Sequence, residues 1–76
     1  MKVYNLIAHN TIDPNYAQFD RAYIDRDAAI AYASKPARCG FYIGEIIVQD
    51  QICEGLLTYR TAIVERIKFN AQGEQI

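Results

Sequence analysis

The alternation of apolar and polar positions predicts two strands in the first third of the chain. Residues 2–9 are rich in β-branched and aromatic side chains, and residues 16–24 alternate more loosely. Between them lies Asp13-Pro14-Asn15, which favours a turn because proline fixes φ and Asn or Asp tolerates turn geometry. We therefore expect an antiparallel pair joined by a six-residue loop. The first strand should place Tyr4, Leu6 and Ala8 on one side, and Val3 and Ile7 on the other.

A short helix is predicted after the second strand. Asp25 is a good N-cap, because its carboxylate can accept a hydrogen bond from the first helical amides. Asp27 lies in the first turn, where the helix dipole favours negative charge. The helix should end near Lys35, since Pro36 disfavours helical geometry at the residue before it. Its apolar stripe is narrow enough for close approach to a sheet and consists of Ala29, Ile30 and Ala33.

Residues 39–48 have the strongest strand pattern in the chain. Phe41, Ile43 and Ile47 should point one way, and Tyr42, Ile46 and Val48 the other. Because both faces are apolar, this segment is expected to be a central strand. Gly40 and Gly44 interrupt it and predict a bulge or a close backbone approach. The polar run 49–51 is predicted to be a turn.

Residues 52–67 fit two patterns. As part of a strand over 57–70, they have one apolar edge and one largely cationic edge. As a helix, they have an apolar stripe made of Ile52, Leu56, Tyr59, Ile63 and Ile67. The β-branched content and a turn signal at 70–73 favour the strand, and residues 74–76 suit a short fifth strand.

The predicted element order is therefore strand, strand, helix, strand, strand. This order predicts a single small α+β domain over residues 1–76, in which an antiparallel sheet of four to five strands has one short helix packed on one face. One helix can cover only one face of such a sheet. The other apolar face must then be covered by a partner, by a second copy in a homodimer, or by curling of the sheet.

Composition and charge exclude several classes of protein. A hydrophobic content of 51% and a charged content of 22% are typical of a globular domain. A net charge of −1 argues against both a broadly basic nucleic-acid binder and an acidic DNA mimic. Two cysteines are too few for a disulfide-stapled secreted miniprotein, and the N-terminal residues show no signal-peptide pattern and no membrane span. We expect a cytoplasmic protein.

The residues that could carry catalysis or bind a metal form no recognisable site. His9 is the only histidine, and Cys39 and Cys53 lie 14 residues apart without a CxxC motif, so a zinc site would need all three to converge with a carboxylate. Helix capping and solvation explain the acidic cluster formed by Asp20, Asp25 and Asp27. The glycines match no phosphate-binding loop. We expect no catalytic residue, no cofactor and no metal.

The surface is rich in side chains that anchor interfaces. The chain has six tyrosines, and three cations should project from one face of the last long strand. The predicted partner-binding residues are Arg60, Arg66, Lys68, Tyr42 and Tyr59. The cations form either a ridge that binds phosphates or an acidic protein, or a solvated face whose long side chains cover apolar surface.

Several local features resemble a known family. They are Ala33-Ser34-Lys35 at the helix end, Cys39 soon after it, an aliphatic strand through Gly44, and the closing turn at 70–74. With the order of elements, they resemble the small anti-CRISPR proteins of phages and mobile elements that wrap an antiparallel sheet around one helix and block type I surveillance complexes. The resemblance implies steric occlusion of a surface and no catalytic residues. The chain has fewer lysines than the more basic members, which argues against DNA contact.

These observations lead to a main hypothesis and two alternatives. The first is a non-enzymatic binding protein of phage or mobile-element origin that inhibits a host protein or nucleoprotein complex in a bacterial cytoplasm. The second is a small nucleic-acid-binding or regulatory domain, as a monomer or a dimer, that uses the same cations on phosphates. The third is an enzyme or metal site built around His9, Cys39 and Asp25.

Overall fold

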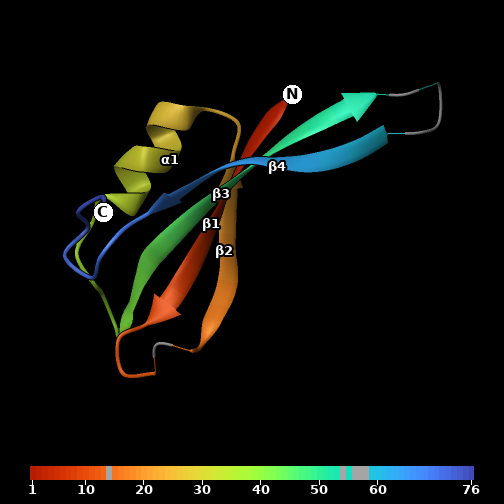
Figure 1. Ribbon diagram of the computed structural model, residues 1–76. Helices are drawn as coiled ribbons and strands as arrows, with labels where there is room; N and C mark the ends of the chain where they lie inside the picture. Colours follow the sequence, from red (N-terminus) through yellow and green to blue (C-terminus); the bar gives the residue numbers. More distant parts are fainter. Residues whose placement is uncertain (14, 54, 56–58) are drawn as a thin grey trace.

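The computed structural model describes residues 1–13, 15–53, 55 and 59–76 and has one helix and four strands (Figure 1). The elements are β1 (Lys2–Asn10), β2 (Ala17–Tyr23), α1 (Arg26–Ala33), β3 (Phe41–Cys53) and β4 (Tyr59–Lys68). They form one sheet in the order β2-β1-β3-β4, and every neighbouring pair is antiparallel. The predicted α+β class and the predicted element order are confirmed. No helix in the described part of the chain is long and apolar enough to cross a membrane.

The hydrophobic core lies between α1 and one face of the sheet (Figure 1). Alternation along β1 places Tyr4, Leu6 and Ala8 in this core, as predicted. From α1, Ala29 and Ala33 are fully buried, because alanine allows the helix backbone to come close to the strands. The other buried residues come from β3, β4 and the segment that follows: Ile43, Ile46, Val48, Ile67 and Phe69.

The predicted ends of α1 are close to those observed. Asp25 has extended backbone geometry, and its carboxylate accepts a hydrogen bond from the Asp27 amide at 3.3 Å, so the predicted N-cap is confirmed. The last helical residue is Ala33. Ser34 then caps the C-terminus, where its amide and hydroxyl both donate to the carbonyl of Ile30.

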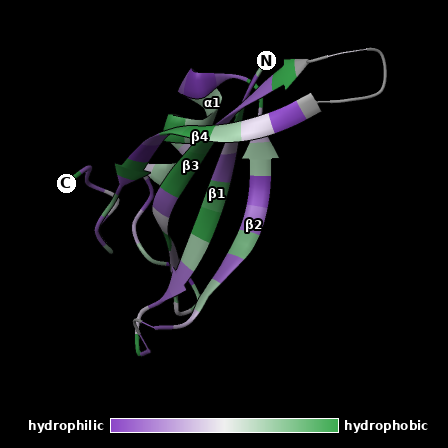
Figure 2. Ribbon diagram, turned by 45° about the vertical axis from the view of Figure 1, so that its right-hand side comes forward, coloured by the Kyte–Doolittle hydropathy of each residue, from purple (hydrophilic) through white to green (hydrophobic). Residues whose placement is uncertain are grey.

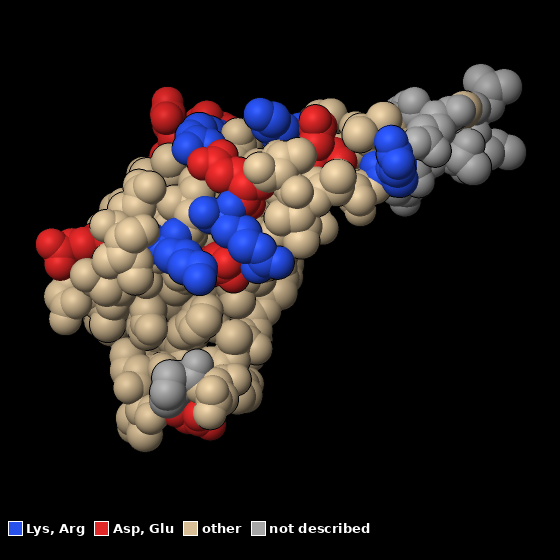
Figure 3. Space-filling model, viewed as in Figure 1, with Lys and Arg blue, Asp and Glu red and all other residues tan. Residues whose placement is uncertain are grey.

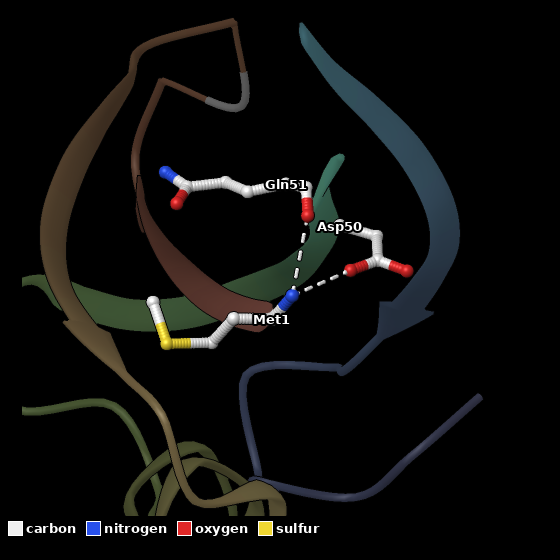
Figure 4. A network of polar contacts seen from close by, with 3 residues as sticks. All are labelled: Met1, Asp50 and Gln51. Carbon is white, nitrogen blue, oxygen red and sulfur yellow. Dashed lines mark hydrogen bonds and ion pairs between the residues drawn. The ribbon is translucent and has the colours of Figure 1, made fainter. Parts of the chain in front are cut away.

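β3 is longer than predicted, and the turn predicted at 49–51 is wrong. Gln49, Asp50 and Gln51 lie inside β3, where they pair with β4 on one side. The N-terminus also holds this segment, since the Met1 ammonium donates to Asp50 Oδ1 at 3.1 Å and to the Gln51 carbonyl at 3.2 Å (Figure 4). Residues 49–51 form a polar run that in isolation favours a turn. Here they remain in a strand because they are hydrogen-bonded to the N-terminal segment on one side and to β4 on the other.

β3 and β4 each contain a β-bulge that changes which side chains share a face, and β2 contains a third at Asp20. Ile7 pairs with Glu45 and Ala8 with Ile43, so Gly44 is an extra residue on β3. The predicted bulge or close approach at Gly44 is confirmed. The bulge also brings Ile43 to the same face as Ile46 and Val48, and the prediction that Ile43 lies opposite them is wrong. On β4, Val64 is the extra residue of the second bulge.

A tight turn precedes β3, so this strand begins at Phe41 rather than at Cys39. Arg38 and Phe41 exchange backbone hydrogen bonds of 2.7 and 3.0 Å. The two residues between them, Cys39 and Gly40, both have positive φ, of 53° and 83°. Positive φ at both central positions is the geometry of a type I′ hairpin turn.

For the described residues of 52–67, the ambiguity is resolved in favour of strands. β3 continues to Cys53 and β4 runs from Tyr59 to Lys68, while Leu57 and Thr58 lie outside the described residues. The predicted turn at 70–73 is confirmed, because the Asn70 side-chain oxygen accepts hydrogen bonds from two amides that follow it. In place of a fifth strand, the chain end forms one isolated bridge between Phe69 and Gln75.

Candidate partner-binding surface

The face of the sheet turned away from α1 is called the open face here. Since side chains alternate along a strand, the residues between the core positions point to this face. The cross-strand register places the following on it: Val3, Ile7, His9, Phe19, Tyr42, Glu45, Ile47, Gln49, Ile63, Arg66 and Lys68.

Large apolar side chains lie among polar ones on the open face. Ile7 pairs with Phe19 across the β1–β2 ladder, and Ile47 lies on the neighbouring strand β3. Phe19 is 58% exposed and Ile63 51% exposed, whereas Ile7 and Ile47 are half-buried. Figure 2 shows β1 and β3 with hydrophobic stretches along their lengths and β2 alternating between hydrophobic and hydrophilic residues. Large apolar side chains are therefore accessible on a face that α1 does not cover.

A polar pair fixes the geometry within this region of the open face. The side-chain amide of Asn5 donates to Gln49 Oε1 at 2.9 Å and to the carbonyl of Ile47 at 3.2 Å. These part-buried hydrogen bonds join β1 to β3 through side chains as well as through the backbone. A partner would thus meet a surface in which the side chains of Asn5 and Gln49 are already held in place.

The end of the open face near the β2–β1 loop is basic and aromatic. We call the group formed by His9, Tyr42, Gly44, Glu45, Arg66 and Lys68 the basic end. The rings of His9 and Tyr42 lie 5.9 Å apart between centroids. The other residues line a shallow hollow together with His9.

Charge at the basic end is partly compensated. Arg66 Nη1 contacts Glu45 Oε2 at 3.2 Å, and half of the Arg66 side chain is exposed. Exposed ion pairs of this kind contribute little to stability, about 0–1 kcal/mol. Lys68 has no ion-pair partner among the residues that the structure describes. The local balance is one net positive charge beside two aromatic rings.

His9 holds the basic end against the backbone of β3. A Cβ atom built on Gly44 would lie only 2.4 Å from His9 Cδ2, so the ring occupies the space that any other residue would need. His9 Nε2 is buried and has no hydrogen-bond partner within the described structure. The lack of a side chain at position 44 is therefore what allows the His9 ring to pack against the strand there.

The structure brings three of the five predicted binding residues together. Tyr42, Arg66 and Lys68 all belong to the basic end. Arg60 does not share their face, because it pairs with Ile52 beyond the Val64 bulge, which reverses the alternation. The side chain of Tyr59 lies outside the described residues.

A continuous cationic ridge along β4 is not formed. In the view of Figure 3, Lys and Arg atoms alternate with Asp and Glu atoms instead of forming one positive area. The clearest example of an acidic residue beside a basic one lies on the face of the sheet that α1 covers. There Arg26 Nη1 and Nη2 contact the two carboxylate oxygens of Glu65 at 2.8 and 3.1 Å. This bidentate pair lowers the pKa of Glu65 and raises that of Arg26. It joins α1 to β4.

Sequence reasoning missed several residues of this surface. His9 was considered only as a catalytic or metal-binding residue, and Phe19 and Ile63 were not assigned to a binding face. The adjacent apolar residues Ile63 and Val64 were a signal for the second bulge, because they break the alternation of β4. In the described part of the chain, no group of three or more His, Cys, Asp or Glu could hold a metal ion.

Comparisons of the chain with protein-family models, with curated proteins and with solved structures gave no match. The surface is therefore interpreted from its own geometry.

Proposed function

We propose that this protein is a non-enzymatic binding protein whose partner covers the open face of the sheet. One observation supports this proposal above all others: α1 covers a single face, while the opposite face exposes more than half of Phe19 and of Ile63. Completely burying a large apolar side chain contributes about 1.5–3 kcal/mol. Covering these two residues and their half-buried neighbours would thus supply a substantial part of a binding free energy.

The charge pattern favours a protein partner over a nucleic-acid backbone. Arg66 is paired with Glu45, and the acidic and basic atoms in Figure 3 are interleaved. A protein that binds a phosphate backbone needs several uncompensated cations along the path of that backbone. The more phosphates these cations neutralise, the more steeply the affinity falls with salt concentration. A protein surface with both signs of charge matches the basic end better.

The resemblance to small anti-CRISPR proteins indicates which kind of partner to test first. We propose that the protein inhibits a host defence complex of the type I surveillance class by occluding its surface. A small domain with a preformed apolar face and no required catalytic group suits this mode of action. Direct binding of nucleic acid, with the open face on phosphates, is the competing function.

The proposal can be tested in bacteria with an active type I CRISPR–Cas system. Expression of the protein should restore plaque formation by a phage that the system targets. Ile63→Asp should abolish this effect, because it replaces an exposed apolar side chain of the open face with a charge. Ile12→Asp is the matched control, since Ile12 is 89% exposed in the loop between β1 and β2 and lies off the open face.

Both variants should retain the thermal unfolding midpoint of the parent protein, as judged by circular dichroism. Failure of the parent to restore plaquing against every type I system tested would contradict the defence-inhibitor proposal. Full activity of a folded Ile63→Asp variant would exclude the open face. Salt-sensitive DNA binding by the purified protein would favour the competing function.

A further inference from the structure

A second hollow, which we call the ring pocket, lies where the end of α1 meets the start of β3. Its volume is about 290 Å³. Tyr32 from α1 and Phe41 from β3 line it, and Tyr42, whose side chain belongs to the open face, borders it. All three are half-buried, so part of each side chain is accessible. The proposed function on the open face leaves most of this pocket unused.

The charges around the ring pocket are unequal. Lys35 and Arg38 line it, and the Lys35 ammonium lies 4.8 Å from the centre of the Tyr32 ring. The one lining carboxylate, Asp20, is already paired with Arg21 at 2.9 Å. Arg38 has no ion-pair partner among the described residues. An occupant with a negative charge is therefore favoured.

The walls of the pocket are preformed. Arg38 and Phe41 hold the tight turn between them through two backbone hydrogen bonds. The Ala37 amide donates to the carbonyl of Ala71 at 2.8 Å, and the Thr11 amide donates to the carbonyl of Gly40 at 2.9 Å. The turn is thus fixed to both the C-terminal segment and the β1–β2 loop. A site ordered before binding avoids the entropy cost of ordering it.

We propose that the ring pocket receives an aromatic side chain of the partner protein that has a carboxylate next to it. This inference rests on the proposed function and specifies the chemistry of the partner. The volume is at the lower limit of ligand sites, which begin at about 300 Å³, and therefore suits one ring. Buried aromatic anchors supply much of the affinity at protein interfaces.

The position of Tyr42 connects the two surfaces. Its ring lies against His9 at the basic end, and the residue also borders the ring pocket. A partner seated on the open face can therefore extend around this end of the sheet and insert one residue into the pocket. A nucleic-acid strand would instead require stacking platforms and cations repeated along a groove. Here both Lys35 and Arg38 lie at one pocket.

The pocket can be tested without knowing the partner, by NMR titration of the ¹⁵N-labelled full chain. The main probe is 4-hydroxyphenylacetate, which combines a tyrosine ring with a carboxylate. Tyrosol has the same ring with a neutral hydroxyl group, and AMP represents nucleotides. We expect saturable shifts of the Tyr32, Arg38 and Phe41 amides with 4-hydroxyphenylacetate, and weaker binding of tyrosol and AMP.

Substitutions then separate the charge from the ring. Lys35→Ala with Arg38→Ala should weaken binding of 4-hydroxyphenylacetate about two- to fivefold per cation, the range of an exposed ion pair, and leave tyrosol binding unchanged. Lys2→Ala is the matched control, because Lys2 is an exposed cation at the other end of β1. The double variant should also lose activity in the plaquing assay.

Each result supports or overturns the inference. Absence of shifts, or shifts away from Tyr32, Arg38 and Phe41, would overturn it. Tighter binding of AMP than of 4-hydroxyphenylacetate would also overturn it, in favour of a nucleotide site. The titration needs no partner, so probe binding with failed plaquing would refute only the proposed function. Active plaquing without probe binding would refute only the ring pocket.

Discussion

Substitution of Gly44 by alanine tests whether the contact between Gly44 and the His9 ring maintains the bulged geometry of β3. The added Cβ would lie 2.4 Å from His9 Cδ2 and 2.7 Å from Cγ, closer than real Cβ contacts. The φ angle of Gly44 is outside the left-handed region, so alanine can adopt the backbone conformation. The cost must therefore come from displacement of the ring or of the strand.

The expected loss of stability follows from two opposing effects. Overpacking a well-packed site costs about 1–3 kcal/mol. Replacing glycine by alanine recovers about 0.4–1 kcal/mol, because alanine lowers the entropy of the unfolded chain. The net destabilisation should be about 1–2 kcal/mol. In a domain of this size, each kcal/mol lowers the unfolding midpoint by about 4–8 °C.

A double-mutant cycle isolates the contact. Urea unfolding of the parent, Gly44→Ala, His9→Ala and the double variant can be followed by the fluorescence of the six tyrosines. Without the His9 ring, Gly44→Ala should cost less than about 0.5 kcal/mol or even stabilise the protein. Gly40→Ala is the control: it has positive φ but no atom within 4 Å of the added Cβ, so its cost should not depend on His9. An equal cost of Gly44→Ala in both backgrounds would refute the reasoning.

Three further predictions concern other supports of the fold. Gly73→Ala should cost more than Gly44→Ala, above about 2 kcal/mol, because its φ is +83° and the Cβ would lie 2.8 Å from backbone atoms of Lys35; an unchanged thermal midpoint would contradict this. Asp25→Ala should remove the N-cap and cost about 0.5–2 kcal/mol in urea unfolding, whereas Asp25→Asn should retain most of the stability. The pair of Arg26 with Glu65 should make stability depend on pH. Because the folded-state pKa of Glu65 is lowered, its contribution is present above the ordinary value of 4.5 and is lost as the pH falls through the lower folded-state pKa. The difference in thermal midpoint between the parent and Glu65→Gln should therefore disappear in acid; a difference that persists there would count against the pair.

Part of the candidate surface could be located from the sequence. Which residues share a face, and which elements come together to form the ring pocket, could not be predicted. Tyr42, Arg66 and Lys68 were predicted to bind a partner, and the structure places them close together at the basic end. Arg60 was assigned to the same face by simple alternation, which the bulge at Val64 reverses. The ring pocket had no sequence signal, since its lining comes from α1, β1, β2, β3 and the segment between α1 and β3, and is assembled only when these elements pack.

Local physical chemistry determined the order and kind of the elements. An aspartate N-cap, alanines on one helical stripe and β-branched alternation act over a few neighbouring residues, and each had the expected effect at Asp25, Ala29 and β1. Tertiary pairing decided the rest. It kept residues 49–51 in a strand, and it left Gly44 without a partner residue on β1, which makes a bulge. The reason is that a strand's register depends on its partner's side chains: Gly44 bulges where the His9 ring, 35 positions earlier in the chain, takes up the space beside it.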